Sequence, residues 1–121
     1  MTEPRTEPPL RYVEERPWGG FEKFVQNEPV SVKRIWVEPG KRLSLQSHTM
    51  RSELWTMLSG SMEVQVDDVI TTVSTGDQIF VPCGSKHRAT GLDARAEWLE
   101  IAFGTFDEDD IVRFEDDFGR A

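Results

Sequence analysis

The chain has only two histidines, His48 and His87, and polar side chains that can bind a metal lie close to the first. Gln46 precedes His48 by two positions, and Glu53 follows it by five. Residues two apart on a strand project from the same face, so Gln46 and His48 point the same way, and a returning strand can bring Glu53 alongside. His87 comes from a distant hairpin. These nitrogen and oxygen donors suit zinc, iron, manganese, cobalt or nickel, and they leave coordination positions open for water or substrate.

The spacing of glycine and proline around the histidines favours a metal site over a simple hydrogen-bonded pair. A histidine near a glutamate is more often one half of a hydrogen-bonded pair than a metal ligand. Here, however, Gly40 and Gly60 bound the first stretch, while Gly76, Pro82 and Gly84 precede His87 at set distances. Because glycine makes up about 7% and proline about 5% of residues in proteins, this joint spacing rarely arises by chance.

Short β-strands separated by turns are the elements that must position these residues. Segments rich in β-branched and aromatic residues, or alternating with period two, indicate strands. Glu38-Pro39-Gly40 and Asp67-Asp68 are typical turns between them. Many short strands at close spacing predict an all-β sandwich or barrel, of which the jelly roll is one class. The predicted strands cover residues 30–37, 54–58, 61–66, 69–73, 78–81 and 97–103.

The 121 residues correspond to one domain. Residues 1–15 contain three prolines and mixed charge, so we expect a flexible N-terminal arm followed by a single domain over residues 16–121. The last segment, residues 106–121, is strongly acidic. Its apolar residues Ile111, Val112, Phe114 and Phe118 fit a short helix or a packed extended segment, and a solvated acidic tail is the alternative.

Composition narrows the classes of function. With 14 Lys and Arg against 22 Asp and Glu, the net charge of −8 argues against a general binder of nucleic acid or of an anionic membrane surface. No apolar run approaches the roughly 20 residues of a membrane helix, and the N-terminus lacks the apolar region of a signal peptide. The single cysteine, Cys83, excludes an internal disulfide framework. We therefore expect a cytoplasmic protein.

The two glycine-bounded stretches resemble the paired motifs of the cupin superfamily, in which glycine, histidine, glutamate and proline recur at set spacings. Within it the chain is similar to type II mannose-6-phosphate isomerases, usually the C-terminal half of a bifunctional protein that is also a mannose-1-phosphate guanylyltransferase. Most cupins have histidine where this chain has Gln46, and glutamine there is typical of these isomerases. The resemblance rests on His48, Arg51 and the runs RPWG (16–19), KRI (33–35), PGKRLSLQ (39–46), ELW (53–55) and EDDIVRFEDDFGR (108–120).

The resemblance implies a cupin double-stranded β-helix, a jelly-roll barrel, with a divalent metal in its mouth. The family's ligands correspond to Gln46, His48, Glu53 and His87, with Zn²⁺ expected first and Mn, Fe, Co or Ni as alternatives. It also implies that the acidic tail docks near the site. The chain departs from the family at Gly91, where asparagine usually closes the second motif.

The implied reaction is the interconversion of mannose 6-phosphate and fructose 6-phosphate, an aldose–ketose isomerisation. A divalent metal can stabilise the negative charge that develops on O1 and O2 of the open-chain sugar, and a positioned base moves the proton. Arginine and lysine would hold the distant phosphate. The catalytic candidates are Arg113 and Glu115, and the substrate-binding candidates are Lys33, Arg42, Arg51 and Arg120.

Two other functions stay open on the sequence. One is a different metal-dependent cupin enzyme, such as a dioxygenase or another sugar isomerase or epimerase, and the other is a non-catalytic cupin that binds a sugar. The expected partner is a small sugar phosphate rather than nucleic acid or membrane. We also expect a homodimer, since the N-terminal arm can cover a neighbour's sheet edge.

Overall fold

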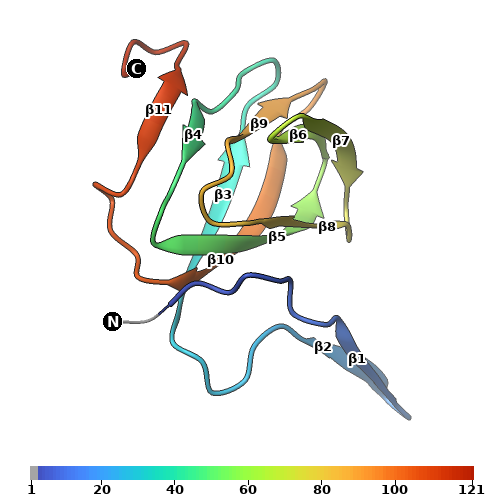
Figure 1. Ribbon diagram of the computed structural model, residues 1–121. Coiled ribbons are helices and arrows are strands. Elements are labelled where there is room, and N and C mark those ends of the chain that lie inside the picture. The colour runs from blue at the N-terminus through green and yellow to red at the C-terminus, as the bar shows by residue number, and fades with distance from the viewer. Residues whose placement is uncertain (1–2) are drawn as a thin grey trace.

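Eleven β-strands make up the regular structure of residues 3–121 in the computed structural model, which describes those residues (Figure 1). Over this range the chain forms no long apolar helix of the kind that crosses a bilayer. The strands are β1 (Tyr12–Arg16), β2 (Gly19–Lys23), β3 (Val30–Val37), β4 (Leu45–Ser47), β5 (Arg51–Ser59), β6 (Ser61–Val66), β7 (Val69–Ser74), β8 (Gln78–Val81), β9 (His87–Gly91), β10 (Ala96–Gly104) and β11 (Val112–Glu115).

Two antiparallel sheets form the barrel. One has the strand order β3-β10-β5-β8 and the other β11-β4-β9-β6-β7, so strands distant in the sequence lie next to one another. The predicted segments at 30–37, 61–66 and 78–81 match the bounds of β3, β6 and β8, and the other three lie within longer strands. The prediction of an all-β jelly-roll barrel is confirmed.

The main core lies between the two sheets. Trp55 and Trp98 stack there with their ring centroids 5.0 Å apart, and both side chains are buried. A second, smaller cluster, the outer cluster, lies on the other face of the sheet β3-β10-β5-β8. There Leu54, Ile101 and Phe103 pack under the segment that links β2 to β3. Since β10 contributes to both clusters, it is buried on both faces, which accounts for its apolar composition.

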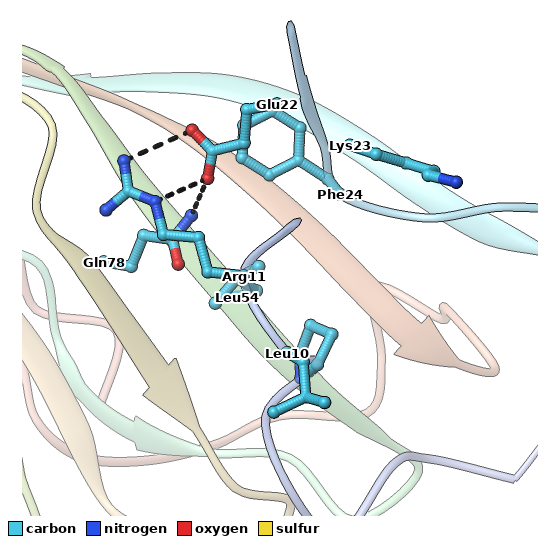
Figure 2. A pocket seen from close by; sticks show the side chains of 8 residues that line it. Leu10, Arg11, Glu22, Lys23, Phe24, Leu54 and Gln78 are labelled. Carbon is cyan, nitrogen blue, oxygen red and sulfur yellow. Dashed lines mark hydrogen bonds and ion pairs between the residues drawn. The ribbon is translucent and has the colours of Figure 1, made fainter. Parts of the chain in front are cut away.

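The N-terminal segment forms a separate hairpin of β1 and β2 that projects from the barrel (Figure 1). Figure 2 shows where it is anchored: Arg11 and Gln78 both bind the carboxylate of Glu22, with Arg11 Nε at 2.9 Å and Gln78 Nε2 at 3.0 Å from Oε2. The predicted boundary between arm and domain falls inside this hairpin, because residues 12–15 already pair with β2. Residues 1 and 2 lie outside the described residues, and the flexibility of the arm stays a prediction.

The acidic tail is an extended segment rather than a helix. Its strand β11 pairs with β4, so it becomes the edge of the second sheet. Beyond β11, the carboxylate of Asp117 accepts two hydrogen bonds from Arg42, and that of Asp116 accepts two from the guanidinium of Arg120. The tail is therefore docked on the barrel, and part of its acidic charge is paired with arginine.

Gly91 stands where related motifs have asparagine, and the structure supplies a reason. A Cβ atom at this position would overlap the backbone carbonyl oxygen of Glu38, while the Gly91 amide donates a hydrogen bond to the Lys41 carbonyl at 2.7 Å. Gly91→Ala should therefore lower the free energy of unfolding by about 1–3 kcal/mol, the usual range for overpacking. Urea denaturation of both proteins measures this loss, and an unchanged midpoint would show that the loop can move aside.

Candidate metal centre

Three neighbouring strands place three predicted site residues in one row. Arg113 of β11 lies opposite Gln46 of β4, and Gln46 lies opposite His87 of β9. Residues directly opposite on adjacent strands project from the same face of a sheet. The row therefore faces the other sheet, whose strand β5 carries Glu53.

His48, Glu53 and His87 form a buried cluster whose potential ligand atoms all lie within 4.8 Å of one another. The Nε2 atom of His48 is 3.7 Å from Glu53 Oε2, and the Nε2 atom of His87 is 3.9 Å from Glu53 Oε1. Both distances are too long for hydrogen bonds. The cluster is thus not the simple histidine–glutamate pair considered above, and the spacing suits three donors around a common centre.

Hydrogen bonds at the Nδ1 atoms orient both imidazole rings so that their Nε2 atoms face that centre. The Nδ1 atom of His48 lies 2.7 Å from the Asp110 carbonyl oxygen, and that of His87 lies 3.1 Å from the Ser85 carbonyl oxygen. Since a carbonyl only accepts, each Nδ1 carries the proton and each Nε2 presents a lone pair inward. Burial lowers the pKa of both histidines, so they are neutral at pH 7, as metal ligands must be.

The environment of the Nε2 atom of His87 fits a bound cation. This atom is buried and has no hydrogen-bond partner among residues 3–121, an arrangement that costs free energy unless something binds there. Glu53 is held by hydrogen bonds from Trp55 Nε1 at 2.9 Å and Arg51 Nε at 3.1 Å. Because Arg51 Nη2 also lies 3.3 Å from His48 Nε2, a cation bound to that nitrogen would take the place of this contact. The donor set matches the mixed nitrogen and oxygen ligands of divalent transition metals.

A cavity of about 160 Å³ opens beside the cluster. Lys33, Arg51 and Arg113 contribute positive charge to its wall, and the Nε atom of Arg113 is buried without a hydrogen-bond partner among the residues that the structure describes. The Lys33 ammonium is 3.3 Å from the carboxylate of Glu108, an exposed tail residue at the same cavity. The wall is formed by Lys33, Ile35, Leu43, Gln46, His48, Arg51, Glu53, Trp55, Glu100, Glu108, Ile111 and Arg113.

Four predicted site residues are not among those that line this cavity, and one of them is the buried His87. Arg42 and Arg120 bind tail carboxylates, as described above, and Glu115 lies 3.4 Å from Arg88. The strand pairing explains the position of Glu115: a register shift between Arg113 and Glu115 sets Glu115 opposite Leu45. Such a bulge reverses the usual rule that residues two apart share a face, so Glu115 points away from Arg113.

Two residues that the sequence reasoning missed belong to the site. Glu100 lines the cavity from β10, and Asp110 of the tail contacts the turn around His48. Burial, followed by the nearby charge of Glu53, raises the pKa of Glu100 to about 8. Burial tends to raise the pKa of Asp110, but hydrogen bonds from Thr49 and Met50 outweigh it and lower the value. The sequence did hold a signal for Glu100, because this charged residue stands between the apolar Leu99 and Ile101 in a predicted strand.

Glu100→Gln should stabilise the metal-free protein, and more so at high pH. The pKa of Glu100 is about 8 in the folded chain against an ordinary 4.5. Between these two pH values the folded state therefore binds one proton more than the unfolded state. The free energy of unfolding therefore falls as the pH rises through this range, and glutamine, which does not titrate, removes the fall. The shift from 4.5 to about 8 corresponds to a gain of about 4–5 kcal/mol at pH 8.5 and of less than about 1 kcal/mol at pH 5. Urea unfolding with a chelator present measures both, and equal gains would contradict the expectation.

The sequence matches a protein-family model and parts of longer bacterial proteins. The family model described as mannose-6-phosphate isomerase C-terminal matches residues 6–116. The xanthan biosynthesis protein XanB of Xanthomonas campestris is 39% identical over 107 residues, which cover 87% of this chain and 23% of XanB. The mannose-1-phosphate guanylyltransferase ManC of Salmonella typhimurium is 35% identical over 87% of this chain and 22% of its own length. The chain thus spans less than a quarter of these relatives.

Solved structures agree with this assignment at the level of the fold. An oxalate decarboxylase from Bacillus subtilis superposes with a TM-score of 0.66 at 27% identity, covering 72% of this chain and 24% of that one. A cupin protein from Bacteroides fragilis superposes with a TM-score of 0.58 at 19% identity, covering 63% of this chain and 66% of that one. The buried His48, Glu53 and His87 cluster is consistent with a cupin metal site. The chain therefore belongs to the family of mannose-6-phosphate isomerase C-terminal domains and has the cupin fold.

Proposed function

We propose that the chain is a metal-dependent isomerase that interconverts mannose 6-phosphate and fructose 6-phosphate. The observation that carries the proposal is the buried Nε2 atom of His87, which has no hydrogen-bond partner among residues 3–121 and lies beside His48 and Glu53, two residues that line a cavity with cationic walls. The family assignment supports the same activity. A sugar phosphate has the two features that such a cavity selects, hydroxyl oxygens for a metal and an anionic group for arginine and lysine.

The proposed metal ligands are Gln46, His48, Glu53 and His87. The two imidazoles would bind through Nε2, Glu53 through its carboxylate and Gln46 through its amide oxygen. Zn²⁺ is the proposed ion, since this donor set suits it, with Mn, Fe, Co and Ni as alternatives. When bound, such an ion stabilises negative charge that develops on O1 and O2 of the sugar.

The remaining cavity residues bind and orient the substrate in this proposal. Arg113 has a buried Nε without a partner, so it can donate hydrogen bonds to a phosphate at no cost in existing contacts. Lys33 adds a second positive charge at the same cavity. The cavity of about 160 Å³ is smaller than the roughly 300–1,000 Å³ of most ligand pockets, so we expect the exposed Glu108 to move away from Lys33 when substrate binds.

A coupled assay tests the proposal. The purified chain is stripped with a chelator, reloaded with Zn²⁺ and given mannose 6-phosphate, and formation of fructose 6-phosphate is followed through a coupling enzyme. We expect turnover that disappears with chelator and returns with metal. Binding of mannose 6-phosphate without turnover, for every metal of the set, would instead support a non-catalytic sugar-binding domain.

We also propose that the protein is a cytoplasmic homodimer with a small sugar phosphate as its ligand. The projecting hairpin of β1 and β2 supports the dimer, because Tyr12, Val13, Trp18 and Phe21 leave much of their apolar surface exposed on it. A hairpin of two strands is only marginally stable alone, so contact with another chain would stabilise it. Sedimentation equilibrium gives the mass directly, and a monomer at micromolar concentration would contradict the dimer.

A further inference from the structure

Asp110, a residue of the acidic tail, makes four hydrogen bonds to the three residues of one turn. Its carboxylate accepts from Thr49 N at 3.0 Å, from Thr49 Oγ1 at 2.9 Å and from Met50 N at 2.9 Å. Its backbone carbonyl accepts the fourth, from His48 Nδ1, at 2.7 Å. A single residue distant in the sequence thus holds both the backbone of the turn and the ring of a proposed metal ligand.

This turn has little regular structure of its own to hold it. It links β4, which ends at Ser47, to β5, which begins at Arg51, and β4 is only three residues long. The carboxylate of Asp110 satisfies two successive backbone N–H groups at the turn, which would otherwise need water or another acceptor. The orientation of His48 therefore depends on contacts with the tail as well as on strand pairing.

Further contacts fasten the same part of the tail to the start of β5. The amide of Thr105 donates a hydrogen bond to the Met50 carbonyl at 3.0 Å, and Arg51 Nη1 donates one to the Asp107 carbonyl at 3.2 Å. The Arg51 guanidinium also lies over the ring of Phe106, 4.3 Å from its centroid. These contacts bring Asp110 to the turn as part of a fastened segment, so its position is defined by the fold.

We propose that Asp110 is a positioning residue for the metal centre, fixing the ring orientation and the tautomer of His48 from the tail. The inference rests on the proposed metal site. Residues that orient metal ligands in this way typically contribute about 10–100-fold to metal affinity. It extends the proposed function, because it makes the docked tail a condition for tight metal binding.

Metal titration of three variants tests the proposal. Zn²⁺ affinity is measured by competition with a chelating indicator for the full chain and for Asp110→Ala, Asp110→Asn and Asp109→Ala. We expect a 10–100-fold loss for Asp110→Ala. Asn keeps one acceptor oxygen, so the Zn²⁺ affinity of Asp110→Asn should lie between that of Asp110→Ala and that of the unchanged protein. Asp109→Ala removes the same charge from an exposed neighbouring side chain and should bind Zn²⁺ like the unchanged protein.

A second measurement keeps the test independent of metal binding. Long-range ¹H–¹⁵N spectra of the metal-free protein report the tautomer of His48, and we expect the Nδ1–H form in the unchanged chain. Asp110→Ala keeps the backbone carbonyl that accepts from Nδ1 but loses the carboxylate contacts that hold this carbonyl at the turn, so we expect a mixture of tautomers in that variant. If Zn²⁺ does not bind to the unchanged protein, the proposed function fails, while the spectra still decide the role of Asp110. A folded Asp110→Ala variant with unchanged affinity and tautomer would overturn the inference. Should that variant not fold, Asp110→Asn decides by the same two measurements.

Discussion

His87→Ala is expected to lower the affinity for Zn²⁺ by about 10²–10³-fold and to abolish isomerase activity. The His87 side chain is 1% exposed, its Nδ1 is fixed by the Ser85 carbonyl, and its Nε2 has no hydrogen-bond partner within the described part of the chain. Free energies of about 10–16 kcal/mol for four-ligand zinc sites correspond to roughly 3 kcal/mol for each ligand. The variant should therefore lose metal before it loses its fold.

Competition titration and the coupled assay measure the two effects together. Ser52→Ala is the matched control, because Ser52 is also fully buried with an unpartnered polar atom but lies opposite Phe103, whose ring packs on the outer cluster. It should keep both metal affinity and activity. Equal losses in the two variants would mean that His87 acts through stability alone, contrary to the metal assignment.

Arg113→Ala is expected to lower kcat/KM for mannose 6-phosphate by about 10²–10⁴-fold while leaving Zn²⁺ affinity within about threefold. Arginine can make two charge-assisted hydrogen bonds to a phosphate, each contributing about 1.5–3 kcal/mol. Arg113 is the arginine at the cavity whose buried Nε has no partner. Arg113→Lys should recover part of the activity, since it restores the charge without the two-pronged geometry.

Arg120→Ala is the control for this prediction. Arg120 belongs to the same tail motif and was a substrate-binding candidate on the sequence, but its guanidinium binds Asp116 and does not line the cavity. Steady-state kinetics of the three variants should show a large loss for Arg113→Ala and less than about a twofold change for Arg120→Ala. A larger loss for Arg120→Ala would contradict the assigned binding site.

Alternation and β-branched composition were sufficient to predict the strands that build the core. They failed for β4, with three residues, and for β9, where His87 and Arg88 interrupt any apolar pattern. Both strands carry polar residues because they form the wall of the site. The acidic tail was ambiguous for a similar reason, since its apolar residues suit a helix or a strand until pairing with β4 decides.

The candidate site was predictable where spacing along one strand or turn determines geometry. Gln46, His48 and Glu53 are close in sequence, and the structure brings His48 and Glu53 together with His87. The parts of the site whose geometry depends on strand register were not predictable. The bulge that turns Glu115 away, and the contact between Asp110 and the turn at His48, depend on how β11 pairs with β4. A single sequence gives no information about that pairing.

The most direct test is a crystal structure of the zinc-loaded protein with anomalous data collected on both sides of the zinc absorption edge. We expect one strong anomalous peak per chain, within about 2.0–2.2 Å of His48 Nε2, His87 Nε2 and the nearest oxygens of Glu53 and Gln46. An anomalous map without a peak among these side chains, or with Arg51 still bound between His48 and Glu53, would contradict this expectation.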